Sequence, residues 1–508
     1  MSLRNKVFKS SIIIVVFYVL AKILSFLVEM LIASNYGACF ETDAYYLAEG
    51  IYMAFIPLIS VGIWKVFMPE YKKMIVAGKI EDANSFTGSM ILVFFLLSVL
   101  VTVYFLIFPE SLISAFAPGY NIHQISYSSE LLRILSFTFI VATVTVFPTA
   151  ILQSRSLFSK SQLKEVLVFI FPLVYLILFS KDYGLYGLIV SSIIGNIFAM
   201  IVLYYLVSPF YKFKISHSCR LKKYLGVLKL YPIACLNSIL LQMNAVIDKM
   251  FSSTLFIGSI TVLSYGTKVI NLFNGIISTA ISVSLFPYFT EMIAKNEITE
   301  FQKFFLKCVS MMCALLVPMV FLLCLFSNEI IYILFGYGKF SESAIKETSN
   351  VLFMYGLGLM AMGLTTIVND IFFIRKQASV LLYTTIVNLL CNIVLDFIFI
   401  NRFSVSGLSL ATTISLYISL LLKFFFLRNI VSVNRFLILN FISVLLSCIL
   451  SWLSIHVLNH LFTEDSNVFI RLVVNVSVFV LIYILTIQFN NFYRNQCKGL
   501  LVNIVKKI

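Results

Sequence analysis

The chain has 508 residues, of which 61% are hydrophobic and only 12% are charged, about half the charged fraction of a soluble globular protein. This composition excludes a soluble enzyme or binding domain and indicates a polytopic membrane protein. The net charge of +15 is spread over short loops instead of being clustered in one domain, so it does not indicate nucleic-acid binding.

The N-terminal segment predicts an uncleaved first membrane span, because its basic and apolar residues ("MSLRNKVFKSSIIIVVFYVLAKIL") are not followed by a small-residue cleavage site. A membrane helix needs about 20 mostly apolar residues, and fourteen stretches of the chain meet this requirement. They cover residues 10–34, 44–69, 86–108, 129–153, 162–180, 184–207, 224–251, 258–288, 303–327, 347–373, 378–400, 406–427, 435–457 and 467–489.

Lysine and arginine are unevenly divided between the two sides of these spans. The side that holds the N-terminus collects most of them, including Lys72, Lys73, Arg155, Arg375 and Arg428. Because cytoplasmic loops carry an excess of basic residues, this asymmetry predicts that both termini are cytoplasmic.

The short loops and the scattered histidines and cysteines argue against a catalytic or metal site. No loop is long enough for a folded soluble domain, and the four histidines are scattered along the chain. The nine cysteines show no CxxC spacing, which speaks against a zinc site or a disulfide framework. The sequence therefore does not favour a membrane enzyme or an assembly scaffold, and we expect no cofactor.

Two halves of the chain resemble each other at one nearly constant offset. The stretch "FMPEYKKMI" at 67–75 is similar to "LFPYFTEMI" at 285–293, and "SAFAPGYN" at 114–121 is similar to "ILFGYGKF" at 333–340. Each half holds six spans, so the copies share one orientation and are related by an axis along the membrane normal. Such repeats are typical of transporters.

The predicted fold class is therefore an all-α polytopic membrane protein with 14 transmembrane helices. Two six-helix lobes, related by a pseudo-two-fold axis along the membrane normal, cover residues 1–215 and 216–430. Two extra C-terminal helices follow in residues 431–508.

The lysines within the predicted spans include Lys22, Lys65, Lys229 and Lys268. Lys65 and Lys229 lie toward cytoplasmic ends, where a long side chain extends to the headgroups. We expect Lys22 and Lys268 to face a cavity between the halves and to attract an anionic group; pairing of each with a buried acid is the alternative. Glu29 is two helical turns from Lys22, about 10 Å, so these two cannot pair directly.

Acids within the spans raise a second question. Asp43, in "ETDAYY", is most simply a helix N-cap. Asn392 and Asp396 lie one helical turn apart and project from one helix face. With Asp248 and Thr412 they supply two carboxylates, an amide and a hydroxyl, which suit a small hard cation. Sodium fits this set, a proton on Asp396 fits as well, and an Asp396–lysine pair that only packs helices is the third possibility.

Several motifs resemble those of the MurJ/MviN family, the lipid II flippases of the multidrug/oligosaccharidyl-lipid/polysaccharide exporter superfamily. They are "NYGACFETDAYYLA" at 35–48, "FAPGY" at 116–120, "GSITVLSYGTKVINLFNGIISTAISVSLFP" at 258–287 and "LFGYGKFSES" at 334–343. The 14-span layout matches as well, and the resemblance covers nearly the whole chain.

The resemblance implies a two-lobed, inverted-V fold in the bacterial inner membrane, working as a monomer in the lipid bilayer. The family carries an undecaprenyl-pyrophosphate-linked sugar to the outer leaflet by alternating access, with the last two spans holding the lipid tail. It implies a substrate site at Lys22, Glu29, Asp43 and Lys268. It also implies a Na+ site at Asp248, Asn392, Asp396, the Leu408 carbonyl and Thr412.

The chain departs from the family at its essential arginines, whose positions fall on Lys22, Val28, near Ile56, and Lys268. Two are lysine here and two are apolar. Lysine is a point charge, whereas arginine binds pyrophosphate with a planar fork. A lipid II-like substrate leads, a Wzx-type flippase for a capsule or O-antigen repeat unit is the alternative, and a cation-coupled multidrug antiporter is third.

Overall fold

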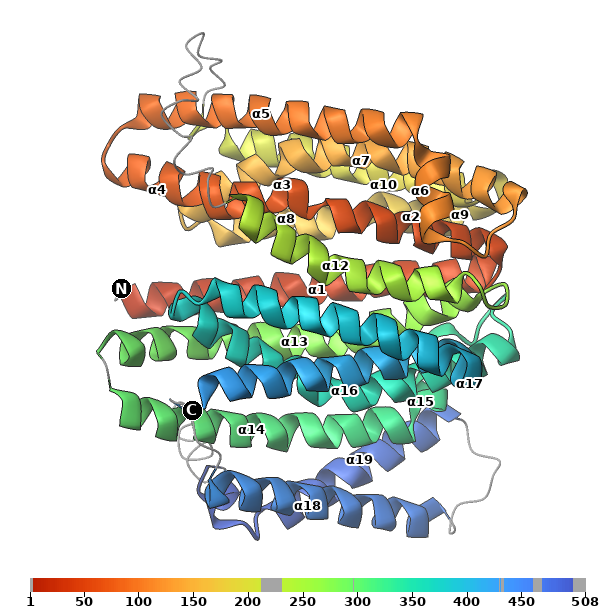
Figure 1. Cartoon of the computed structure of the whole chain (residues 1–508). Helices are drawn as coiled ribbons and strands as arrows, with labels where there is room; N and C mark the ends of the chain where they lie inside the picture. Colours follow the sequence, from red (N-terminus) through yellow and green to blue (C-terminus); the bar gives the residue numbers. More distant parts are fainter. Residues whose placement is uncertain are drawn as a thin grey trace. The chain divides into compact units, whose positions relative to one another are not determined.

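The computed structural model describes residues 3–211, 231–295, 297–428, 430, 434–459 and 468–496, and every regular element in these ranges is a helix (Figure 1). The elements are α1 (Leu3–Tyr36), α2 (Phe40–Phe55), α3 (Pro57–Gly62), the π-helix η1 (Ile63–Phe67), α4 (Met68–Val76), α5 (Ile80–Ile107), α6 (Pro109–Phe116), α7 (Ile122–Ser154), α8 (Phe158–Leu167), α9 (Ile170–Leu178), α10 (Ser180–Val207), α12 (Tyr231–Ser252), α13 (Ser259–Ala294), α14 (Ile298–Leu325), α15 (Ser327–Phe335), α16 (Glu342–Ile374), α17 (Ala378–Leu427), α18 (Arg435–Asn459) and α19 (Val468–Ile487).

The predicted all-α membrane class is confirmed. Eleven of the described stretches are long and apolar enough to cross a membrane. One of them, α17, reverses at Ser404 (φ 53°, ψ −135°) and so accounts for two predicted spans. The helices α12 and α13 match the spans predicted at 224–251 and 258–288, so the helices are consistent with all fourteen spans in order. The predicted lobe boundaries after residues 215 and 430 adjoin segments outside the described residues and stay predictions.

Prolines interrupt two of the predicted spans. The span predicted at 162–180 is divided into α8 and α9 at Val168 and Phe169. Pro172 explains this break, because a proline lacks the N–H that would bond the carbonyl one turn earlier and its ring clashes with that carbonyl. The span predicted at 44–69 is divided into α2 and α3 at Ile56, directly before Pro57, and continues as the π-helix η1 before Pro69.

The backbone repeats the internal symmetry predicted from the motifs. Ser156 and Lys376, which occupy matching positions of the repeat, both have a left-handed φ (62° and 58°) although neither is glycine. Gly184 and Ser404, separated by the same offset, share a second unusual conformation, with φ 54° and ψ −143° in the first and φ 53° and ψ −135° in the second. Unrelated sequences have no reason to place two such rare conformations at one spacing. We call the corresponding halves the N-terminal copy and the C-terminal copy.

The chain forms two compact units, which are described separately. Unit 1 comprises Met1–Tyr265, Tyr337–Ala344 and Asp396–Leu408. Its central helix is α7, which packs against α2, α5 and α10 (Figure 1). The Phe67 ring fills the core beside Phe86 and Phe147, with ring centroids 5.6 and 5.0 Å away.

Unit 2 comprises Gly266–Gly336, Ile345–Leu395 and Ser409–Ile508. In it α18 packs against α14 and α19 (Figure 1). Polar groups fix this packing: the Tyr493 hydroxyl donates to the Ser310 carbonyl (3.0 Å), and the Asn440 amide donates to the Ser310 hydroxyl (3.3 Å). Such interhelical hydrogen bonds are the usual means of joining membrane helices, because apolar surface gains little by leaving lipid.

Candidate functional site

Glu29 is a buried carboxylate on α1 and is held in place by α2. The Tyr46 hydroxyl donates a hydrogen bond to its Oε2 atom (2.7 Å). The Tyr46 ring packs edge-on against Tyr265, with centroids 5.5 Å apart, and the Tyr46 carbonyl accepts a hydrogen bond from Lys249 Nζ (2.7 Å). Tyr46 therefore connects α1, α12 and the start of α13. Lys22 lies two turns before Glu29 and is half-buried.

Asp43 caps a helix, but not its own. It lies in the first turn of α2, whose N-cap is Cys39, so the predicted N-cap role for α2 is wrong. Its carboxylate instead accepts hydrogen bonds at the start of α13: from Gly258 N (2.6 Å), Thr261 N (2.7 Å) and the Thr261 hydroxyl (2.6 Å). A negative charge is favourable there because the helix dipole and unpaired N–H groups both attract it. Asp43 thus joins the two copies of the repeat within unit 1.

Two glycines of the family motifs meet two serines in a reciprocal arrangement. Gly119, from "FAPGY", approaches Ser253 so closely that a Cβ would collide with the serine carbonyl, and its N–H donates to the Ser253 hydroxyl (3.4 Å). Gly338, from "GYGKF", approaches the Ser34 carbonyl in the same way. Ser34 matches Ser253 and Gly119 matches Gly338 at one offset, so each copy places a glycine loop on the other's serine. All four residues lie in unit 1.

Asp248 and Asp396 form a buried carboxylate pair in unit 1. They come from α12 and α17, and their carboxyl groups lie within hydrogen-bonding distance of each other. The neighbouring rings of Phe251 and Phe397 pack edge-on, with centroids 4.8 Å apart, which fixes the approach of the two helices. Asp396 Oδ1 is fully buried and has no hydrogen-bond partner among the described residues. Two adjacent carboxylates cannot both remain charged without a cation, so these residues fit a bound Na+ or a shared proton.

The remaining predicted ligands divide between the units. Leu408 is fully buried in unit 1. Asn392 and Thr412 are buried in unit 2, where the Asn392 amide donates to the Thr412 hydroxyl (3.2 Å). Lys268 lies on the part of α13 that belongs to unit 2 and is half-buried. The side chains of Lys65 and Lys229, which were predicted to lie toward cytoplasmic ends, are outside the described residues, so that expectation stays a prediction.

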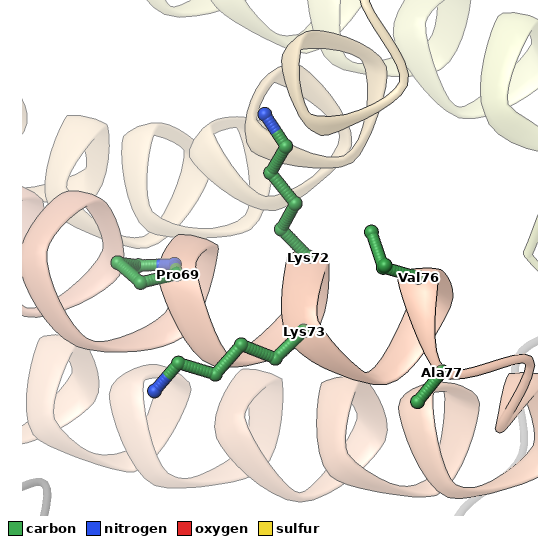
Figure 2. A pocket seen from close by; sticks show the side chains of 5 residues that line it. All are labelled: Pro69, Lys72, Lys73, Val76 and Ala77. Atoms are coloured by element: carbon green, nitrogen blue, oxygen red, sulfur yellow. The ribbon is translucent and has the colours of Figure 1, made fainter.

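A surface pocket on α4 is unrelated to these groups. It is lined by Pro69, Lys72, Lys73, Val76 and Ala77 (Figure 2). Figure 2 shows the two lysines extending from α4 in different directions. All five residues belong to one helix or its cap, so this hollow is a feature of the helix surface and not a path between helices.

The structure shows three buried polar groups that the sequence did not single out. Tyr46 and Thr261 hold Glu29 and Asp43 from distant parts of the chain, so no local pattern could have indicated them. Lys423 is buried in α17, and here a signal existed: it is the one basic residue in the apolar run "SLLLKFFFL".

Comparison with known proteins agrees with the resemblance in the motifs. The family described as "Lipid II flippase MurJ" matches residues 32–479. A "Probable lipid II flippase MurJ" of Buchnera aphidicola subsp. Baizongia pistaciae is 24% identical over 416 residues, 79% of each chain. Another, of Aquifex aeolicus, is 24% identical over 382 residues, 73% of each chain.

Solved structures show the same fold. The inward closed conformation of a lipid II flippase MurJ superposes with a TM-score of 0.81 at 22% identity, covering 96% of this chain and 100% of that one. A multidrug resistance MATE family transporter of the MOP superfamily gives 0.65 at 16% identity, covering 80% and 94%. Since the family match extends over most of the sequence, this multi-pass membrane protein belongs to the lipid II flippase MurJ family, a family of transporters and not of enzymes.

Proposed function

We propose that this chain moves an undecaprenyl-pyrophosphate-linked cell-wall sugar, lipid II or a close analogue, from the cytoplasmic to the outer leaflet. The family match over residues 32–479 carries this proposal. We place the chain in the bacterial inner membrane as a monomer. Both termini are proposed to lie in the cytoplasm, because basic residues collect on the side that holds the N-terminus.

Lys22 and Lys268 are the proposed contacts for the pyrophosphate. Each lies in a membrane helix and is half-buried. A charge inside the bilayer is costly, by about 2.5–3.5 kcal/mol on insertion scales, and such residues usually line a substrate path. Glu29, held by Tyr46, is proposed to orient the same surface of α1.

Coupling is proposed to act through Asp248 and Asp396, with Na+, the membrane potential, or both as the driving force. The Oδ1 atom of Asp396, which lacks a partner among the described residues, supports a cation at this place. If Na+ binds there, Na+ at saturating concentration will raise the unfolding temperature of the wild type more than K+ will, because a ligand that binds only the folded state stabilises it. The Asp396→Asn variant should lose the Na+-specific part of this shift.

The outer contacts of unit 1 give the alternating-access cycle a physical step. On the predicted topology, Asp43, Gly119 and Gly338 lie toward the outer face, and each contacts the other copy of the repeat. For the copies to separate there and release a sugar, the hydrogen bonds of Asp43 to α13 must break. We propose that these bonds hold the outer side closed.

An export repeat unit on the same lipid carrier is the second candidate. The observation in its favour is the loss of two family arginines: Val28 is buried and Ile56 lies between α2 and α3. Two fewer guanidinium groups change how a pyrophosphate sugar is held. A multidrug antiporter is weaker, since the likeness to a MATE transporter concerns the fold alone and a lysine within the first span does not suit a cationic drug.

Genetic rescue tests the proposal. The chain is expressed in bacteria depleted of their own lipid II flippase, and its membrane insertion is confirmed by immunoblot. Restored growth and wall synthesis are expected for a lipid II flippase. Failure of a properly inserted protein would contradict a lipid II substrate and favour the export repeat unit. That alternative is then tested by expressing the chain in a strain that lacks its capsule flippase and measuring whether capsule export is restored.

Variants of the two lysines sharpen the result. Lys22→Gln and Lys268→Gln should each abolish rescue at wild-type expression, because one of two cationic contacts is lost. Lys73→Gln is the matched control: its side chain is exposed and forms an ion pair with Glu70 on the surface, so rescue should persist. Rescue by either span variant would remove that lysine from the proposed site.

A further inference from the structure

Lys423 is a buried lysine near the end of α17 that the proposed function does not use. Its side chain is only 6% exposed, and among the described residues it makes neither a hydrogen bond nor an ion pair. A lysine this close to a helix end ordinarily extends its ammonium into the headgroup region and stays exposed. Keeping a mostly buried charge without a partner is costly, so a partner from outside the chain is expected.

A polar seam between the two segments of α17 leads to Lys423. It consists of three interactions within unit 2: Asn392 Nδ2 to Thr412 Oγ1 (3.2 Å), Asn388 Nδ2 to Ser415 Oγ (3.3 Å), and Ser419 Oγ to the Thr384 carbonyl (3.2 Å). Each step advances about one helical turn along both segments. The next step places Lys423 level with Val380, in the first turn of α17.

The first turn of α17 offers hydrogen-bond donors to an anion. Gln377 provides no side-chain cap for it, and Ala378 and Ser379 are exposed, so the N–H groups of these two residues are open to a ligand. The N–H of Val380 already donates to the Gln377 carbonyl (3.2 Å). Arg375 and Lys376, both exposed, directly precede the helix. A helix N-terminus with unpaired N–H groups binds phosphate readily, and a nearby buried ammonium strengthens that binding.

The chain itself supplies little to neutralise this charge. The segments on the same predicted side that lie outside the described residues, 212–230, 431–433 and 497–508, contain no Asp or Glu. The fold does not need a lysine at this point either. The matching residue of the N-terminal copy, at the offset that relates Ser156 to Lys376, is Leu203, which is fully buried.

We propose that Lys423 and the first turn of α17 form a binding site for the phosphate of a lipid in the cytoplasmic leaflet. The phosphate belongs to a membrane phospholipid or to a polyprenyl pyrophosphate carrier, and its chemistry is the same in both. The site rests on the packing of unit 2 and on the predicted cytoplasmic position of this helix end. It depends neither on the sugar carried nor on Na+.

The test measures lipid binding to the purified full-length protein by native mass spectrometry. The probes are phosphatidylglycerol, undecaprenyl pyrophosphate and, as the neutral reference, phosphatidylcholine. Lys423→Leu, which copies Leu203, should weaken binding of an anionic probe about tenfold, as expected for one lost charge-assisted contact. Lys423→Arg should retain binding. Arg428→Gln is the control, because Arg428 is exposed and stacks on Phe425 (4.2 Å).

The outcomes separate the sources. Loss for phosphatidylglycerol alone identifies a phospholipid site, and loss for undecaprenyl pyrophosphate alone identifies a carrier site. Unchanged binding of both by folded Lys423→Leu overturns the proposal, as does a lower unfolding temperature of this variant in lipid-free detergent, which would show a structural role.

A second measurement uses the wild type and needs no variant to fold. Phosphatidylglycerol or undecaprenyl pyrophosphate should protect Lys423 from an amine-reactive reagent, and phosphatidylcholine should not. Equal labelling with all three overturns the proposal. A failed growth rescue leaves both measurements intact, so the two hypotheses fail independently.

Discussion

The two copies of the repeat share a backbone but differ in where they place charge. Three buried ionisable residues have buried apolar counterparts at the matching positions of the other copy: Asp396 matches Leu176, Lys423 matches Leu203, and Asp43 matches Val262. Apolar residues fill the matching positions of the other copy, so the shared backbone alone does not require a charge there. Asp43 nevertheless has a structural use, because it caps α13. Asp396 and Lys423 show no such use among the described residues, so these two are the better candidates for function.

The contrast between polar and apolar positions is clearest where two antiparallel segments pack together. In the N-terminal copy these are α10 and the segment before α9, and in the C-terminal copy they are the two segments of α17 on either side of Ser404. In the N-terminal copy, Gly195 lies so close to Val168 that a Cβ would stand 2.6 Å from the Val168 carbonyl. At the matching positions of the C-terminal copy, Ser415 and Asn388 form a hydrogen bond of 3.3 Å. One copy packs backbone against backbone, and the other joins its segments by polar side chains.

Glu29 and Asp248 are the exception, because both copies place an acid at this matching position. Glu29 accepts a hydrogen bond from Tyr46, whereas Asp248 faces a second carboxylate. The same acidic position thus lies beside a tyrosine hydroxyl in one copy and beside a second carboxyl group in the other. Two adjacent carboxyl groups are stabilised by a shared proton or by a bound cation.

The largest expected effect follows from making the C-terminal copy resemble the N-terminal one at the carboxylate pair. Asp396→Leu should abolish growth rescue while leaving the protein folded. Its stability should be unchanged or higher by about 1–4 kcal/mol, because apolar replacements of buried ionic groups are often stabilising. The measurements are rescue and thermal unfolding in detergent. Leu176→Met is the control and should retain rescue; rescue by Asp396→Leu would show that the carboxylate has no part in transport.

A variant of Asp43 tests how much its charge, which connects the two copies of the repeat, contributes to stability. Asp43→Asn removes the negative charge and one acceptor from the start of α13, and each hydrogen bond to a charged group contributes about 1.5–3 kcal/mol. We expect a loss of that size in the free energy of unfolding, measured by chemical denaturation. Glu41→Gln, an exposed acid in the same turn, should change stability by less than about 0.5 kcal/mol. Equal effects of the two variants would contradict the capping role.

The sequence predicts what depends on local pattern and misses what depends on distant partners. The lengths of the apolar runs predicted the spans, whereas the break between α8 and α9 near Pro172 became visible only in the structure. The N-cap chemistry of Asp43 was recognised, but the helix that it caps begins in the other copy of the repeat, beyond any local pattern. Lys423 was overlooked because a lysine near a span end is ordinarily exposed, and only the packing of α17 buries it. Whether Lys22 and Lys268 bind one substrate stays a prediction, because it depends on how distant parts of the chain come together.

The smallest expected effect distinguishes the two kinds of helix contact. Gly195→Ala adds a methyl group against the Val168 carbonyl and should cost about 1–3 kcal/mol, less the gain in helix propensity of alanine over glycine. Ser415→Ala removes only the hydrogen bond to Asn388, and such bonds contribute about 0.6 kcal/mol on average between membrane helices. Chemical unfolding of both variants gives the order directly. If Ser415→Ala were the more destabilising, the hydrogen bonds between the two segments of α17 would be a structural necessity, and the contrast between the two copies would concern packing alone.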